Sequence, residues 1–320
     1  ADGGRRGGGD EASDGSPVTG LRAALCLALV LAACSDATAP SGTSAADGAD
    51  LLRRAVEAEK SLVYTGEKRT ICGEEGEGRA TRMKVSRTAA GKTYLEWNQG
   101  GGGARRFVYE SRAGWRDDPD LLLRNYSVTL DPADGPAVAW RETRHLLVRG
   151  RRPGRPSLDL YVDKDTSLVL REEMRDFEGK LWLTKVFDSV DFRAPDEPSA
   201  AAQAEPISDP LAARIGTALV PLAVSSAPAG FVRAADDSSR RADGVLREDW
   251  TDGLAAFSVI ERRKPAAERA PEGELRRRRC SGRASVSGVL CGIDVTVVGN
   301  LPVTDLESVA RGLVPSKTQD

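Results

Sequence analysis

The sequence predicts an α+β protein that is mainly antiparallel β: a curved sheet with a covering helix, followed by a small α+β domain. Apolar and polar residues alternate across 158–192 in three runs joined by short turns, which indicates three consecutive strands. Two short segments, 50–60 and 305–313, instead carry apolar residues at helical spacing. Four prolines within 194–210 indicate a linker between the larger and the smaller part.

The three alternating runs predict a meander with one solvent-exposed face. Leu158, Leu160 and Val162 share a face, and turn residues at 165–166 and 178–179 reverse the chain. Further strands are expected at 61–72, 82–87, 93–98, 106–112, 125–130 and 138–149. Because a sheet of this many twisted strands curls, its concave face needs a cover.

The expected helix at 50–60 supplies part of that cover. Asp50 is a suitable N-cap, and an apolar stripe follows at Leu51, Leu52, Ala55 and Val56.

The C-terminal part predicts a smaller, mostly antiparallel unit. A hairpin is expected around 251–253, and a second one joins 284–287 to 292–298. The closing helix at 305–313 follows a capping box from Thr304 to Glu307. The basic run Arg276 to Arg279 is expected in a solvated loop.

Residues 21–34, LRAALCLALVLAAC, have the pattern of a secretory signal. Arg22 precedes eleven uncharged residues, too few to span a bilayer. The segment ends in LAAC, which resembles the lipobox of bacterial lipoproteins, where the cysteine is lipidated and becomes the mature N-terminus. We therefore expect Cys34 to carry a lipid anchor on a membrane of the cell envelope, facing the periplasm. Residues 1–17 have a disorder-prone composition, and we expect the biological start near Val18.

These patterns divide the chain into five parts. They are a leader with a lipoprotein signal peptide at 1–33, a flexible tether at 34–49, a first domain at 50–195, a linker at 196–208 and a second domain at 209–320. With 46 Lys and Arg against 48 Asp and Glu, the net charge of −2 argues against nucleic acid as a partner.

The remaining chemistry-bearing residues predict no active site. His145 is the only histidine, no cysteine pair has zinc-ligand spacing and no G-x-S-x-G motif occurs, so we expect no catalytic residue, no metal and no cofactor. An oxidising compartment permits one disulfide among Cys72, Cys280 and Cys291. Cys280 and Cys291 are the nearest pair, although spacing alone does not fix the partners.

The apolar concave face is the candidate ligand pocket, and plain hydrophobic core is the alternative interpretation of the same residues. The candidate residues are Leu95, Trp97, Phe107, Tyr109, Trp140, Leu158, Leu160, Leu168, Leu170, Trp182 and Val186.

Two regions resemble the MucB/RseB family of periplasmic sigma-E regulatory proteins. Residues 155–192, with the D-x-x-T turn DKDT between two strands, are similar to the family's N-terminal domain. PAGF at 228–231, TDGLAAFSVIE at 251–261 and GIDVTVVGNLP at 292–302 are similar to its C-terminal domain. Together the resemblance covers roughly residues 50–195 and 209–316.

The resemblance implies a half-barrel closed by helices, similar to lipoprotein carriers, plus a small C-terminal domain. It implies a non-enzymatic protein that binds the periplasmic part of an anti-sigma factor and shields it from proteolysis. Release would follow envelope stress, sensed through a lipid or lipopolysaccharide ligand. The alternatives are a lipid or lipoprotein carrier without a sigma-system partner, and a structural envelope lipoprotein. The anchor at Cys34 departs from the better-known members, which are soluble in the periplasm.

Overall fold

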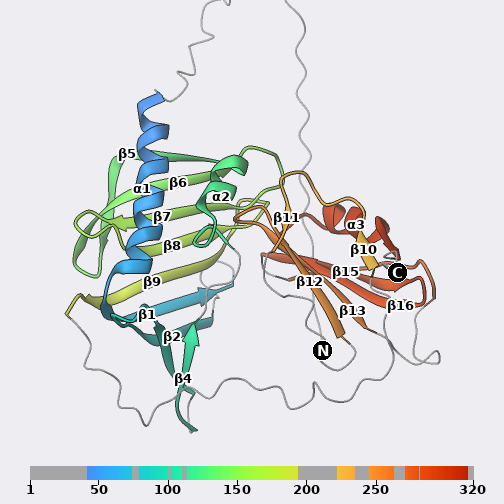
Figure 1. The fold of residues 1–320 in the computed structure, drawn as a ribbon, viewed down its shortest axis with the longest axis horizontal. Helices are drawn as coiled ribbons and strands as arrows, with labels where there is room; N and C mark the ends of the chain where they lie inside the picture. The colour runs from blue at the N-terminus through green and yellow to red at the C-terminus, as the bar shows by residue number, and fades with distance from the viewer. Residues whose placement is uncertain are drawn as a thin grey trace, which may run out of the picture. The chain divides into compact units, whose positions relative to one another are not determined.

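The computed structural model describes residues 42–73, 79–99, 102–109, 114–193, 222–234, 245–262, 271–280 and 282–315. They form a nine-stranded sheet, a six-stranded sheet, a two-stranded ribbon and three helices (Figure 1). Every pairing between the named strands is antiparallel, and both larger sheets are open. The expected α+β class, dominated by antiparallel strands, is confirmed.

The nine-stranded sheet joins two meanders through its first and last strands. Its order is β4-β3-β2-β1-β9-β8-β7-β6-β5, so β1 pairs with β9 across more than a hundred residues. The strands are β1 Tyr64–Cys72, β2 Arg79–Arg87, β3 Thr93–Gln99, β4 Gly102–Tyr109, β5 Tyr126–Val138, β6 Arg141–Gly150, β7 Ser157–Asp163, β8 Val169–Arg175 and β9 Leu181–Asp191.

Helix α1, Gly42–Ser61, packs on this sheet through the expected stripe. It begins eight residues before Asp50, so the expected cap at Asp50 is wrong and 42–49 belong to the helix rather than to a tether. Contact with β5 explains the extension, because a Cβ at Gly48 would lie 2.7 Å from the carbonyl oxygen of Val128. Glycine allows the helix to pack directly on the strand backbone.

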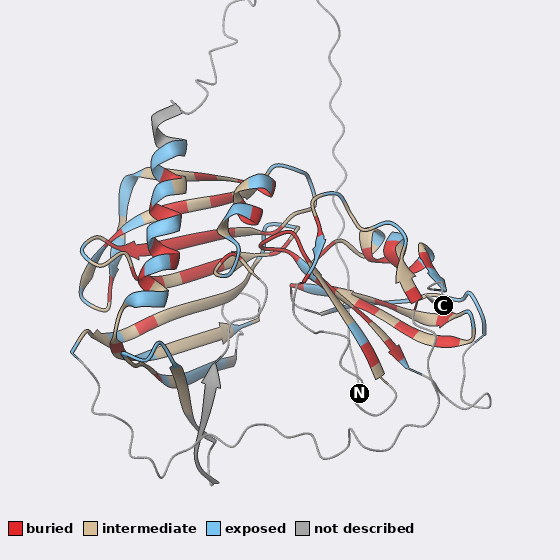
Figure 2. Ribbon diagram, in the orientation of Figure 1, coloured by how far each residue is buried: buried red, intermediate tan, exposed pale blue. Residues whose placement is uncertain are grey.

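The first core is concentrated where α1 crosses β6, β7 and β8, whereas β1 and β9 are mostly half-buried (Figure 2). The second face of β7 differs from the expected wet face, because Asp159, Tyr161 and Asp163 are also buried. Long arginines cover it: Arg149 pairs with Asp159 at 2.6 Å and Arg141 with Asp163 at 2.9 Å. Arginine stems shield strand surface while the head groups remain ion-paired.

A short helix, α2 Pro119–Asn125, lies between the strands expected at 106–112 and 125–130, where no helix was expected. The Asp118 side chain accepts a hydrogen bond from the Leu121 amide at 2.8 Å, and Pro119 opens the first turn. These are an N-cap and a first-turn proline, the usual signals of a helix start.

The second sheet has the order β11-β12-β13-β16-β15-β14, and β10 pairs with β17 in the ribbon. The elements are β10 Leu222–Val224, β11 Val232–Arg233, β12 Val245–Thr251, β13 Ala256–Arg262, β14 Arg276–Cys280, β15 Arg283–Leu290, β16 Ile293–Gly299, α3 Val303–Arg311 and β17 Leu313–Pro315. Both expected hairpins are confirmed as β12–β13 and β15–β16. The expected loop at the basic run is wrong, since those residues form β14.

Helix α3 packs on the second sheet through Leu306, Val309 and Ala310, as expected. The expected capping box is wrong, because the N-cap is Pro302, which has no side-chain cap, and Thr304 lies inside the first turn. Glu307 instead forms an ion pair with Arg311 at 2.8 Å.

Cys280 and Cys291, the nearest pair considered for a disulfide, lie at opposite ends of β15. Cys280 pairs with Arg283 at one end of β15, and Cys291 follows the other end as an exposed free thiol. Eight strand residues at about 3.3 Å each separate the two positions, far beyond disulfide reach.

The β12–β13 turn contacts the first domain within the compact unit Pro40–Asp320. The buried carboxylate of Asp252 accepts a hydrogen bond from the Tyr126 hydroxyl at 3.0 Å and pairs with Arg155 at 3.1 Å. Asn125 donates to the Asp252 carbonyl oxygen at 3.0 Å, and Leu254 joins the first core.

Among the helices of the described ranges, none combines the length and the apolar character needed to cross a bilayer. Residues 1–41, which include the predicted signal and Cys34, and the linker at 196–208 lie outside the described residues.

Candidate functional site

A cavity of about 350 Å³ lies beside the C-terminal turns of α1, over the half-buried strands of the first sheet. Its volume is within the range of small-molecule sites. The register places its residues on one face, since Lys68 of β1 lies opposite Met83 of β2 and Phe187 of β9. The lining residues are Val56, Glu59, Lys60, Tyr64, Lys68, Thr70, Met83, Val85, Arg87, Thr93, Leu95, Arg116, Asp117, Lys185 and Phe187.

One wall of the cavity is apolar. Tyr64 and Phe187 meet edge to face with ring centroids 5.9 Å apart, and Val85 belongs to the same core cluster. Burial, aided by the nearby carboxylate of Glu59, raises the pKa of Tyr64 to about 12. The phenol is therefore neutral at physiological pH, and this wall suits a hydrocarbon chain.

The other wall carries Lys68, Arg116 and Lys185, three cations that surround the buried carboxylate of Glu172. Lys68 Nζ lies 3.7 Å from one oxygen of this carboxylate, Lys185 Nζ lies 3.7 Å from the other, and Arg116 pairs with it directly. Burial disfavours the carboxylate, but the three cations together hold the pKa of Glu172 far below its ordinary value.

The same cluster has one positive charge in excess. Arg116 also pairs with Glu59, with Nε 2.5 Å from a carboxylate oxygen, so three cations share two carboxylates. Burial, together with the neighbouring charges of Arg116 and Lys185, lowers the pKa of Lys68. An apolar wall beside an excess cation matches the chemistry of an amphiphile with an anionic head group.

The structure assigns the predicted pocket residues to different places. Leu95 lines the cavity. Leu158, Leu160, Leu168 and Leu170 are buried by the protein itself and belong to its hydrophobic core clusters. The side chains of Trp97, Phe107 and Tyr109 lie outside the described residues.

Three further predicted pocket residues do not line this cavity. Val186 follows Lys185 directly, so strand alternation turns it to the opposite face of β9. Trp182 also lies on that face, and the Arg283 guanidinium stands 5.9 Å from its ring. Trp140 is 99% exposed at the β5–β6 turn.

The charged residues of the cavity were missed by the sequence analysis. Glu172 was not predicted as a site residue, although the alternating sequence pattern places it between Leu170 and Met174. A carboxylate at a position whose alternate neighbours are apolar indicates a buried charge, and this was the signal in the sequence. Arg116 carried no such signal, since it reaches the site from a loop.

Among the described residues, no group of three or more His, Cys, Asp or Glu side chains is arranged to hold a metal ion. His145 stacks on Tyr161 with centroids 4.6 Å apart, and its Nδ1 lies 3.1 Å from an Asp131 oxygen. These contacts give His145 a packing role on β6.

No protein-family model and no curated protein matches the sequence. Among solved structures, the MucA/MucB complex of Pseudomonas aeruginosa matches at 23% identity and a TM-score of 0.63, over 85% of this chain and 100% of that chain. MucB in complex with MucA(peri) matches at 24% identity and a TM-score of 0.64, over 85% of this chain and 100% of that chain. MucB alone matches at 23% identity and a TM-score of 0.58, over 85% of this chain and 98% of that chain. The chain thus has the MucB fold across both domains, and the half-barrel expected from the MucB/RseB resemblance is confirmed.

Proposed function

We propose that this chain is an envelope regulatory protein of the MucB/RseB type, which binds the periplasmic part of an anti-sigma factor and has no enzymatic activity. The observation that carries the proposal is the shared fold, which extends over the full length of a MucB chain solved with MucA(peri). The sequence resemblance adds the consequence of binding, namely that the bound segment is shielded from proteolysis.

The predicted anchor at Cys34 places this activity on a membrane of the envelope. A tether holds the protein in the same two-dimensional space as a membrane-spanning partner, which raises the effective concentration of each for the other. Lipidation of Cys34 is tested by metabolic labelling with a fatty-acid probe, with Cys34→Ala as control. Equal labelling of the two forms would remove the tether from the proposal.

The cavity beside α1 is the proposed ligand site that controls release. A lipid shifts the equilibrium toward release only if it binds the partner-free form more tightly than the complex. The apolar wall at Tyr64 and Phe187 and the cations at Lys68 and Lys185 support a lipid with an anionic head group.

The proposal is tested by protease protection. The periplasmic segment of an anti-sigma factor from the same genome is digested with and without the purified chain. We expect slower cleavage with the chain and restored cleavage when an anionic lipid is added. Unchanged cleavage by a folded chain would contradict the regulatory function.

The apolar cavity also favours a second candidate, a lipid or lipoprotein carrier without a sigma-system partner. A carrier would yield co-purified lipid by mass spectrometry and no protection of the anti-sigma segment. The regulator protects the anti-sigma segment in its lipid-free form and loses that protection when anionic lipid is added.

A further inference from the structure

The four arginines of β14 fall into two classes, because a strand turns alternate side chains to opposite faces. Arg277 points toward α3 and pairs with Glu307 at 2.5 Å. Arg279, on the same face, pairs with Glu178 at 2.5 Å. These two arginines are satisfied by carboxylates of this chain.

Arg276 and Arg278 point to the other face, opposite Ser287 and Ser285 of β15. Both are exposed, and neither has an ion-pair partner among the residues described. A run of four like charges thus contains two structural arginines and two that have no ion-pair partner in the described ranges.

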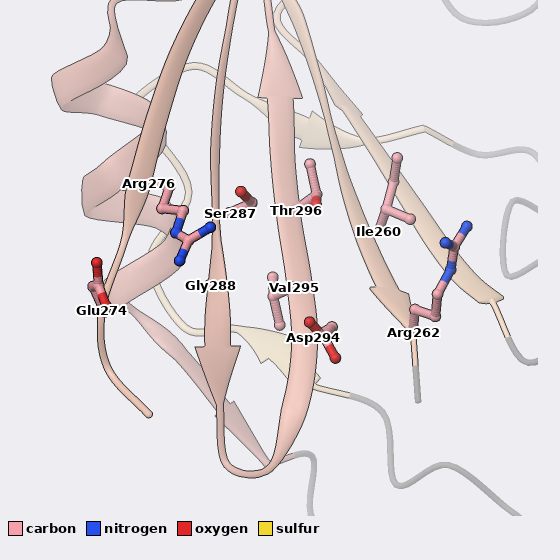
Figure 3. A pocket seen from close by; sticks show the side chains of 9 residues that line it. All are labelled: Ile260, Arg262, Glu274, Arg276, Ser287, Gly288, Asp294, Val295 and Thr296. Atoms are coloured by element: carbon pink, nitrogen blue, oxygen red, sulfur yellow. The ribbon is translucent and has the colours of Figure 1, made fainter. Parts of the chain in front are cut away.

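The face that carries Arg276 is open and hollowed. Helix α3 packs against the opposite face, where Val286 and Val297 are fully buried. On the open face, Arg276, Ser287 and Thr296 line a depression of about 360 Å³ across β14, β15 and β16, and Arg262 and the carboxylates of Glu274 and Asp294 lie at its margins (Figure 3). Guanidinium and hydroxyl groups are donors that match carboxylate oxygens.

The strand β14 is also the edge of the six-stranded sheet. An edge strand presents backbone N–H and C=O groups that a further strand can pair with. A second copy of β14 is disfavoured there, since its own arginines would lie opposite these arginines. An acidic strand is favoured by the same rule.

We propose that β14 is a docking edge for an extended acidic segment of a partner protein, which adds as a seventh strand with carboxylates at alternate positions over Arg276 and Arg278. This inference goes beyond the proposed function and does not depend on it, because it specifies the chemistry of the segment and not the protein that carries it. The depression and its hydroxyl donors favour a narrow peptide over a flat lipid surface.

The test compares two double variants that remove the same charge from the same strand. Arg276→Ala with Arg278→Ala removes the pair on the open face, and Arg277→Ala with Arg279→Ala removes the satisfied pair. The probe is a fluorescein-labelled peptide, Thr-Glu-Val-Glu-Thr-Glu-Val, and its control has Gln at each Glu. Binding to the full chain is followed by fluorescence anisotropy, and vesicles of anionic phosphatidylglycerol are tested in parallel.

We expect the Glu peptide to bind the wild-type chain and the Gln peptide to bind at least tenfold more weakly. The first double variant should lose about tenfold or more in affinity and the second less than about threefold, since the second pair faces away. Thermal unfolding of both variants establishes that they are folded, and Arg276→Lys with Arg278→Lys should retain part of the affinity. Equal losses in both variants, no peptide binding, or Arg276-dependent binding to vesicles alone would each overturn the proposal.

Discussion

The ammonium group of Lys68, which lines a cavity with an apolar opposite wall, lies 3.7 Å from a carboxylate oxygen of Glu172. Lys185 and Arg116 approach the same carboxylate. Glu172 is therefore the counter-charge that allows three cations to remain under α1. The half-barrel contains an electrostatic site as well as an apolar one, and both bear on stability and ligand choice.

Glu172→Gln should destabilise the first domain strongly. The change keeps the shape but leaves the buried cations without their shared partner, which typically costs about 3–5 kcal/mol. Urea unfolding monitored by tryptophan fluorescence measures the loss. The matched control is Glu67→Gln on exposed β1 surface, for which the change should stay within about 0.5 kcal/mol. A loss of equal size in both variants would contradict the role of Glu172.

Acid should weaken the first domain through the same residue. The cations hold the pKa of Glu172 below its unfolded value, so its contribution is present above about pH 4.3 and is lost as the pH falls toward the folded pKa. We expect the unfolding free energy of the wild type to decrease from pH 5 to pH 3 more steeply than that of Glu172→Gln. If the unfolding free energies of the wild type and Glu172→Gln change in parallel with pH, protonation of Glu172 is not linked to folding.

Glu261 should give the second domain the opposite dependence on pH. This residue is 1% exposed, and its carboxylate accepts the Leu222 amide at 3.1 Å. Burial raises its pKa to about 7, so stability is fully present below about pH 4.3 and is lost as the pH rises through 7. The effect is at most about 4 kcal/mol, and Glu261→Gln should remove it in denaturation profiles between pH 4 and 8. A wild-type profile that rises relative to the variant in this window would contradict the assignment.

An Asn-Gly pair at positions 139 and 140 should stabilise the β5–β6 turn. Ala139 and Trp140 have φ angles of 50° and 63°, a left-handed geometry that disfavours both side chains. The double change Ala139→Asn with Trp140→Gly should stabilise the fold by about 1 kcal/mol, as measured by urea unfolding. Trp140→Ala alone keeps a Cβ at positive φ and should give no such gain.

Ligand choice in the cavity should depend on head-group charge. A fluorescent fatty acid should bind more tightly than its methyl ester, and Lys68→Met with Lys185→Met should reduce that preference about tenfold. Lys84→Met, an exposed change on β2, is the control. If acid and ester bind equally well to the wild type, the cations do not select the ligand.

Local patterns predicted much of the fold. Alternation placed Leu158, Leu160 and Val162 in the core, and helical spacing placed the stripe of α1 over them. The pairing of β1 with β9 had no local signal, because it depends on contacts between residues far apart in the chain. Helix α2 was too short for periodicity to show, although Asp118 and Pro119 marked its start.

The candidate site was less predictable for a related reason. Apolar residues on a strand face indicate burial, but do not distinguish core from cavity, so Leu158 and Leu95 looked alike in the sequence. The difference arises from where α1 ends above the sheet. Trp140 appeared to continue a strand, and only the left-handed turn exposes it. In the Arg276–Arg279 run, pairing partners distinguish alternate residues, and these are visible only in three dimensions.

Calorimetric titration of the full chain with the periplasmic segment of an anti-sigma factor from the same genome tests the central claim most directly. The account predicts a one-to-one complex with a Kd on the order of 1 μM or tighter, about −8 kcal/mol. No complex with a folded chain at roughly 100-fold higher concentration of the segment would contradict it.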